Sequence, residues 1–156
     1  MLRLNRLRPF TCFALLAGCL LAIPVLAELT QERITIQGVE RQYLLQLPSK
    51  ASSEPRSLLI LLHGHGGSAG QLVGLNDRTA PFKPWLQIAQ QDNAVLMSAD
   101  GVVGPDGKQG WNDLRGVAGN PSIDDLAFVR ALIELARAEY GVGQKAPTRS
   151  TTPWAA

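Results

Sequence analysis

The chain has 156 residues, of which 46% are apolar, and this suffices for one globular domain with a single hydrophobic core. Its 15 basic and 13 acidic residues give a formal net charge of +2. Three of the basic residues are Arg3, Arg6 and Arg8, so the rest of the chain carries 15 − 3 = 12 basic and 13 acidic side chains. That balance argues against nucleic acid as a partner.

The first 27 residues have the pattern of an export signal. A basic start is followed by an apolar run from Pro9 and by Val25-Leu-Ala27, whose small residues suit a signal peptidase. Gly18 and Pro24 interrupt the run, which favours a cleaved signal over a transmembrane anchor. We therefore predict that residues 1–27 are a signal peptide and that the protein is secreted or periplasmic.

Both cysteines, Cys12 and Cys19, lie in this leader. The mature chain is therefore expected to have no internal disulfide. Leu16-Ala-Gly-Cys19 resembles a bacterial lipobox, although the apolar run continues past it to Leu26. A membrane is expected as a partner only if Cys19 is lipidated.

The first predicted elements after the leader are strands. Residues 31–37 alternate polar and apolar, Gly38 interrupts them, and the pattern resumes over residues 41–47, which predicts an antiparallel hairpin. Residues 57–62 are apolar without alternation, as in a strand of a parallel sheet that is covered on both faces.

A short helix over residues 83–92 and a second buried strand over residues 94–98 follow. Residues 101–121 are rich in Gly, Pro, Asn and Asp and predict a long loop. Ser122 and Asp125 form an S-x-x-D capping pattern that predicts a helix from Ser122. Its expected apolar positions are Leu126, Val129, Ile133, Ala136 and Tyr140.

Strands that alternate with helices predict an α/β layered fold with a mainly parallel sheet. Residues 141–156 show neither helical nor strand periodicity. A parallel sheet would need a further strand after the Ser122 helix, and this part of the sequence predicts none.

The stretch His63-Gly-His-Gly-Gly-Ser-Ala-Gly70 contains a literal G-x-S-x-G around Ser68, the pattern of a hydrolase nucleophile. In such a turn the strand leads almost directly into the motif, whereas three residues intervene here, so the nucleophile interpretation is strained. A glycine-rich loop after an early strand instead suits backbone N–H donors for an oxyanion. A structural turn between strand and helix is the remaining alternative.

Cofactor sites are not expected in this loop. His63 and His65 are the only histidines, and no carboxylate lies nearby in the sequence to complete a zinc site. Gly64 to Ala69 fits a dinucleotide-binding glycine motif loosely, but no strong helix pattern follows. We expect neither metal nor cofactor.

Five motifs fall in order at "RQYLLQLPS", "LLILLHGHGGSA", "SADG", "GWNDLR" and "SIDDLAFVRALIELARAEYGV". Together they resemble the amino-terminal half of secreted poly(3-hydroxybutyrate) depolymerases and feruloyl-esterase-like serine hydrolases of the α/β-hydrolase fold. The resemblance covers about residues 40 to 142. It implies an antiparallel N-terminal hairpin joined to a mainly parallel sheet with flanking helices, and an ester substrate, either a polyester or an aromatic ester.

The resemblance also implies site residues. The oxyanion loop would comprise Gly64, His65, Gly66 and Gly67, with the backbone N–H of His65 as donor. Trp111 and Asn112 would lie at the rim of the substrate pocket, although a turn capped by a packed tryptophan explains them equally well. Asp124 and Asp125 match an acidic pair at a helix start, and we interpret them as helix caps.

The chain departs from this family after residue 142. We expect residues 28–142 to form the first half of the domain and residues 143–156 to be an unstructured tail. The catalytic nucleophile, acid and base would lie beyond the truncation, so the chain as given is expected to be inactive. The alternative is a non-catalytic ligand-binding fragment or a non-functional gene remnant.

A frameshift near residues 143–146 is our hypothesis for the departure. Trp154 fixes one codon, and codons for residues 151–156 in a shifted frame permit His-Ser-Met-Gly-Gly, a nucleophile-like sequence. A glycine two places before that serine is not permitted.

Overall fold

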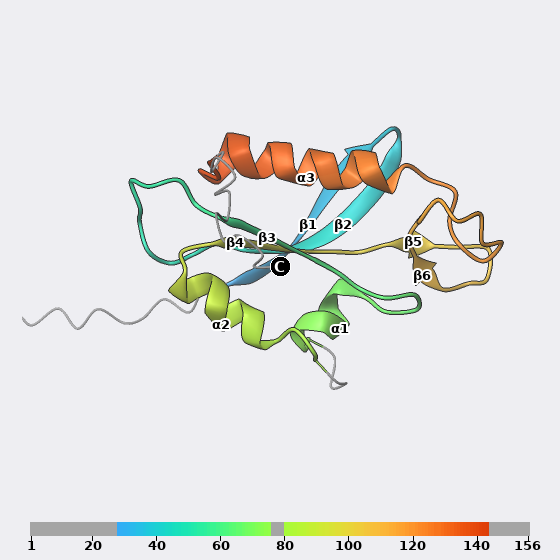
Figure 1. Cartoon of the computed structure of the whole chain (residues 1–156), viewed down its shortest axis with the longest axis horizontal. Helices are drawn as coiled ribbons and strands as arrows, with labels where there is room; N and C mark the ends of the chain where they lie inside the picture. Colours follow the sequence, from blue (N-terminus) through green and yellow to red (C-terminus); the bar gives the residue numbers. More distant parts are fainter. Residues whose placement is uncertain (1–27, 76–79, 144–156) are drawn as a thin grey trace, which may run out of the picture.

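The computed structural model describes residues 28–75 and 80–143. The predicted signal peptide and most of the predicted tail lie outside these residues. A four-stranded sheet forms the middle layer. Helix α3 (Asp125–Glu139) covers one face, whereas α1 (Ala69–Val73) and α2 (Pro84–Gln91) cover the other (Figure 1). The predicted α/β class is confirmed. Within the described residues no helix is long and apolar enough to cross a membrane.

The strand order in the sheet is β1-β2-β4-β3. The strands are β1 (Leu29–Ile36), β2 (Val39–Gln46), β3 (Leu58–Leu62) and β4 (Val95–Ala99). β2 is antiparallel to both β1 and β4, and β3 runs parallel to β4. The predicted N-terminal hairpin is confirmed, and it joins the parallel pair β4–β3 through the edge of β2. The described sheet is therefore mixed in strand direction.

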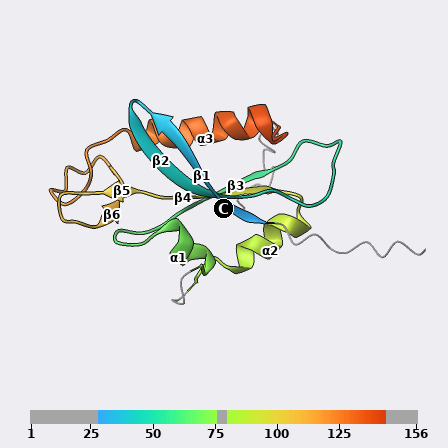
Figure 2. The same ribbon diagram turned by 180° about the vertical axis from the view of Figure 1, so that it is seen from behind.

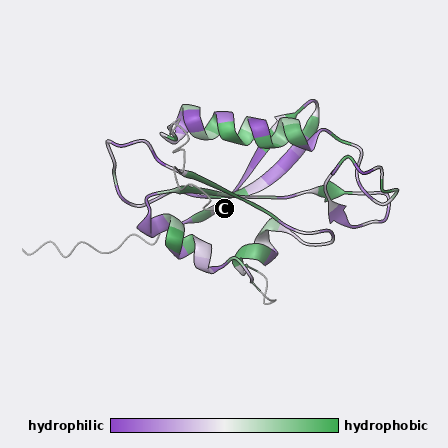
Figure 3. Ribbon diagram, viewed as in Figure 1, coloured by the Kyte–Doolittle hydropathy of each residue, from purple (hydrophilic) through white to green (hydrophobic). Residues whose placement is uncertain are grey.

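Alternation along the central strands divides the core between the two faces of the sheet. Tyr43 and Met97 pack toward α3, whereas Leu44 and Leu96 pack toward α1 and α2. β4 is buried along its whole length because helices cover both of its faces, which explains its mostly apolar sequence. Its one polar residue, Ser98, donates its hydroxyl to the carbonyl of Ala69 at 3.3 Å. Figure 3 accordingly shows mostly hydrophobic residues along β3 and β4.

β3 is less covered than its sequence predicts. Leu61 is buried, but Leu62 is 48% exposed. One edge of β3 pairs with β4, and on the other side Val142, in the chain that returns after α3, forms a parallel bridge with Arg56 just before β3. Gly143 is needed at this crossing because a Cβ there would lie 2.2 Å from the Cβ of Pro55. The chain thus enters the outer edge of β3 in the parallel direction just where the described residues end.

Helix α3 begins later than predicted. Its N-cap is Asp124, whose side chain accepts a hydrogen bond from the amide of Ala127 at 2.8 Å, so Ser122 is not the cap. The buried face also differs by one residue from the predicted one, because Leu126 is 57% exposed. The buried residues are Asp125, Phe128, Leu132 and Ala136.

The predicted long loop between β4 and α3 contains a small hairpin. β5 (Val102–Val103) pairs with β6 (Gln109–Gly110) at one end of the molecule (Figure 2). The two arms approach each other so closely at Gly101 that a Cβ there would lie 2.3 Å from the carbonyl oxygen of Gly110. This hairpin lies beside the loop that leaves β3, since the amide of Gly66 donates to the carbonyl of Gln109 at 2.7 Å.

Candidate functional site

The glycine-rich loop 63–68 connects the carboxyl end of β3 to α1. A shallow pocket of about 310 Å³ lies beside it. The residues lining the pocket are His63, Gly64, His65, Gly66, Gly67, Gln71, Leu72 and Pro81. All four residues predicted for the oxyanion loop therefore face one concave surface at the carboxyl end of β3, which is an edge strand of the described sheet.

Ser68 is the N-cap of α1. Its backbone is extended, with φ −151° and ψ 161°, and its hydroxyl oxygen accepts a hydrogen bond from the amide of Gln71 at 3.1 Å. A nucleophile at a strand-to-helix elbow sits instead in a strained turn with an exposed hydroxyl. The local geometry of Ser68 is that of a helix cap. This agrees with the interpretation of Ser68 as a residue of the loop and not as the nucleophile.

Two of the four predicted loop amides already have acceptors. The Gly66 amide donates to the carbonyl of Gln109 and the Gly67 amide to the carbonyl of Gly64, the latter at 3.0 Å. Gly66 has φ +74°, which favours glycine. These bonds shape the turn, so an incoming oxyanion would have to be met by the other two amides.

The amides of Gly64 and His65 donate to no acceptor within residues 28–75 and 80–143. The direction of the His65 amide is nevertheless fixed. The carbonyl oxygen of Gly64 accepts from the Gly67 amide and lies 2.7 Å from Nδ1 of His63. Because a trans peptide points its C=O and N–H in opposite directions, these two bonds direct the His65 N–H away from them.

The imidazole of His63 is buried and both of its nitrogens are engaged. Nε2 accepts from the amide of Gly101 at 2.9 Å, and Nδ1 therefore carries the proton that it donates to the carbonyl of Gly64. His63 is thus held as a neutral imidazole of defined tautomer. It supports the loop structurally and is not placed as a general base.

The side chain of His65 lies on the surface. Its Nε2 is 2.7 Å from Oδ2 of Asp106. The pKa of the Asp106 carboxyl is lowered, first by the hydrogen bond from the Lys108 amide and then by the hydrogen bond from His65. This pair ties the tip of the loop to the turn between β5 and β6.

Trp111 and Asn112 direct their polar atoms into the fold. The indole Nε1 of Trp111 donates to the carbonyl of His63 at 2.8 Å, and the side-chain amide of Asn112 donates to the carbonyl of Ile123 at 2.9 Å. Neither residue lines the pocket beside His65. Their role at the pocket rim stays a prediction. In the fold, Trp111 ties its loop to His63, and Asn112 ties the same loop to the segment before α3.

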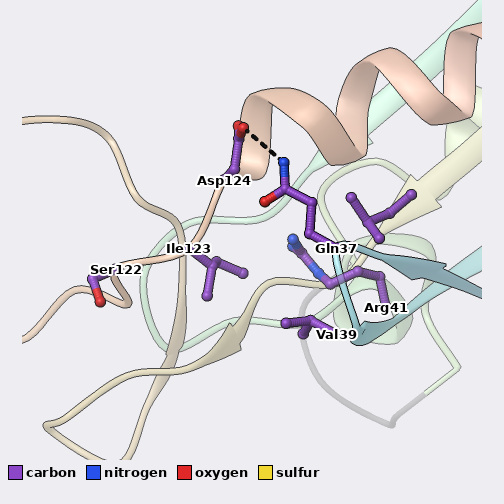
Figure 4. A pocket seen from close by; sticks show the side chains of 7 residues that line it. Gln37, Val39, Arg41, Ser122, Ile123 and Asp124 are labelled. Atoms are coloured by element: carbon purple, nitrogen blue, oxygen red, sulfur yellow. Dashed lines mark hydrogen bonds between the residues drawn. The ribbon is translucent and has the colours of Figure 1, made fainter.

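Asp125 is not a helix cap, contrary to the sequence interpretation. Its carboxylate pairs with the guanidinium of Arg41 at 2.6 Å, and both side chains are buried. Arg41 also lines a second pocket, of about 210 Å³, between the β1–β2 turn and the start of α3. Figure 4 shows Gln37 bridging this pocket to Asp124 with a hydrogen bond of 3.4 Å.

Sequence reasoning missed the two supports of the loop that come from β2 and from the end of β4. The Asp100 carboxylate accepts from the amide of Ala69 at 2.7 Å and so holds the start of α1 against β4. Arg41 could have been noticed as a charge at an inward position of a predicted strand. Within the described residues, no group of three or more His, Cys, Asp or Glu side chains could hold a metal ion.

No protein-family model matches the chain, and no curated protein matches its sequence. Among solved structures, apo S-formylglutathione hydrolase from Staphylococcus aureus is similar with a TM-score of 0.49 and 9% sequence identity. The match covers 76% of this chain and 43% of that hydrolase, so the chain spans less than half of its length.

Proposed function

We propose that this chain is the amino-terminal part of a secreted serine ester hydrolase of the poly(3-hydroxybutyrate) depolymerase or feruloyl esterase type. Its contribution to the reaction is the oxyanion donor of the loop. The observation that carries the proposal is the His65 amide, which has no acceptor within the described residues, points away from two fixed hydrogen bonds and lies beside the pocket.

The chemistry of ester hydrolysis needs such a donor. Attack of a serine oxygen on the ester carbonyl places negative charge on the carbonyl oxygen, and preorganised N–H groups stabilise that charge. Gly64 suits close approach of a substrate, because a Cβ there would meet nothing within 4 Å in this structure. Packing of the described chain therefore does not demand glycine at this position, whereas an ester bound against the loop would.

We place the nucleophile outside the described residues. The bridge between Val142 and Arg56 supports this placement, because a strand continuing beside β3 in this direction would end next to the oxyanion loop. The chain of 156 residues would on this proposal lack a complete triad and hydrolyse esters negligibly.

The proposal is tested first at the gene. Resequencing past the codon of Ala156 should reveal a shifted frame with His-Ser-Met-Gly-Gly or a similar motif, followed by an Asp and a His. Restoring that frame joins the described residues to this continuation, and we call the result the continuous frame. The protein from the continuous frame is then assayed with a short p-nitrophenyl ester, a feruloyl ester and a film of poly(3-hydroxybutyrate). Absence of any such frame would refute the proposal, and so would a protein from that frame that hydrolyses none of the three substrates. The relative rates on the three substrates rank polyester against aromatic ester.

His65→Pro in that protein removes the proposed N–H donor and should lower kcat by about 10²–10³-fold. His65→Ala is the matched control, because it removes the same side chain and keeps the amide. Equal activity of the two variants, at equal thermal stability, would contradict the role of the His65 amide.

Export is part of the proposal. The amino terminus of the secreted protein should begin after Ala27 if the leader is a signal peptide. Labelling with a radioactive fatty acid, with Cys19→Ala as the control, distinguishes free secretion from lipid anchoring.

A further inference from the structure

We propose that the buried ion pair between Arg41 and Asp125 is a positioning pair that sets the direction of the His65 amide. The two residues lie 84 positions apart in sequence and on different layers of the fold. The catalytic meaning of this inference rests on the proposed function, but the structural coupling does not.

The pair is almost completely removed from solvent. The side chains of Arg41 and Asp125 are 1% and 9% exposed, and the guanidinium lies over the ring of Phe128 at 4.0 Å. The Nε of Arg41 has no hydrogen-bond partner within the described residues. Burying a charged group costs desolvation free energy, and a donor without a partner leaves part of that cost uncompensated. The pair is therefore not explained by stability alone. Its bonds to the backbone indicate what else it does.

The first connection runs through one peptide of the loop after β4. Nη2 of Arg41 donates to the carbonyl of Asp100 at 3.3 Å, and the N–H of the same peptide, that of Gly101, donates to Nε2 of His63. The opposite nitrogen of His63 donates to the carbonyl of Gly64. Arg41 therefore fixes the peptide between Asp100 and Gly101, and that peptide fixes the His63 imidazole. The imidazole in turn fixes the peptide between Gly64 and His65, which carries the His65 N–H.

The second connection runs through Asp125. Its Oδ2 accepts from the amide of Asn112 at 2.5 Å, which fixes the backbone next to Trp111. The indole of Trp111 then donates to the carbonyl of His63 and its ring lies 5.1 Å from the His63 ring. This connection fixes the peptide between His63 and Gly64, directly before the one that carries the proposed donor.

Both connections meet at His63. One fixes its imidazole and the other its carbonyl. The peptides between His63 and Gly64 and between Gly64 and His65 therefore cannot rotate independently of each other while the ion pair is intact. The pair thus joins β2, α3 and the loop after β4 to the orientation of a single amide. Since the reacting oxygen would contact loop amides and neither of these two side chains, Arg41 and Asp125 are positioning residues.

The test uses proton–nitrogen correlation spectra of the full chain labelled with nitrogen-15. Asp125→Asn keeps the shape of the side chain and removes its charge, whereas Arg41→Lys keeps the charge and removes the planar guanidinium, so both weaken the pair. Arg33→Lys is the matched control, because Arg33 forms an exposed ion pair with Glu40 on the same hairpin. We expect Asp125→Asn and Arg41→Lys to shift the amide resonances of Gly64 and His65 several times more than the control does.

A double-mutant cycle separates the two connections. In a Trp111→Phe background, Asp125→Asn should shift the Gly64 and His65 amides less than it does in the unchanged protein, because only the connection through Arg41 and Gly101 is then left. Arg41→Lys should still shift both amides in that background. If Arg41→Lys does not fold, Trp111→Phe alone, which leaves the ion pair intact, should shift the Gly64 amide.

The proposal is overturned if the variants change only resonances beside the substituted residue and leave Gly64 and His65 where the control leaves them. Coupling in the spectra with no esterase in the continuous frame would refute the proposed function and leave this inference standing. Esterase activity without coupling would do the reverse.

Discussion

The hydroxyl oxygen of Ser68 accepts a hydrogen bond from the amide of Gln71 at 3.1 Å and so caps the first turn of α1. Ser68→Ala should therefore lower the free energy of unfolding by about 1 kcal/mol, the usual cost of a lost N-cap. Chemical denaturation measures this change. Ser68→Asn is the control, because asparagine caps equally well and should restore most of the stability. In the protein from the continuous frame, loss of esterase activity in Ser68→Ala would contradict our assignment of this serine.

Two glycines of the loop should differ sharply in their response to alanine. Gly66 has φ +74°, a conformation that costs a side-chain-bearing residue about 1–2 kcal/mol. A Cβ at Gly64 would meet open space, and its backbone is not in that region. Gly66→Ala should lower the thermal midpoint, and Gly64→Ala should leave it nearly unchanged. Equal shifts of the two midpoints would show that the loop does not have this backbone conformation.

Arg41→Ala leaves the Asp125 carboxylate buried without its partner. Breaking a buried ion pair on one side costs about 3–5 kcal/mol, which should appear as a large loss in urea unfolding. Arg33→Ala breaks an exposed pair on the same hairpin, where the partners are more than half exposed, and should cost less than about 1 kcal/mol. A similar cost for the two variants would mean that Arg41 is not buried in solution.

Stability should fall at high pH because of Tyr43. Burial, together with the neighbouring Tyr140 and Glu32, raises the pKa of the Tyr43 phenol from 10.0 to about 12. Below pH 10 the phenol is neutral in both states, whereas between about pH 10 and 12 only the unfolded chain ionises. The free energy of unfolding therefore falls over that interval, by up to about 2 kcal/mol.

Tyr43→Phe isolates this contribution, because other groups also titrate in the same range. The difference in unfolding free energy between the variant and the unchanged protein should vary with pH between 10 and 12 and be constant below it. Tyrosinate absorbance gives a second measurement, since Tyr43 and Tyr140 are the two tyrosines of the chain. A difference that stays flat across this range would contradict the raised pKa.

Local periodicity predicted the elements whose burial is simple. The hairpin follows from its alternation, and its turn has positive φ at both Gln37 and Gly38, the geometry that matches strand twist. β4 follows from its mostly apolar run, since each side chain is buried on one face or the other. The start of α3 was predicted wrongly because three candidate caps, at Ser122, Asp124 and Asp125, lie within four residues. Sequence spacing does not say which carboxylate has a buried arginine across the fold.

The sequence alone determined the α/β class and a glycine-rich loop directly after an apolar strand, because both depend on residue type and spacing along a continuous segment. The sequence predicted that strand to be covered on both faces, whereas β3 lies at the edge of the described sheet. The tertiary structure decided which amides of that loop are engaged, that His63 is a neutral support and that Ser68 is a cap. The first two of these roles depend on hydrogen bonds that Gly101, Gln109 and Trp111 make with partners 38 to 48 residues away, whereas Ser68 caps α1 by accepting a bond from the nearby amide of Gln71. Only the folded chain brings such distant donors and acceptors within bonding distance.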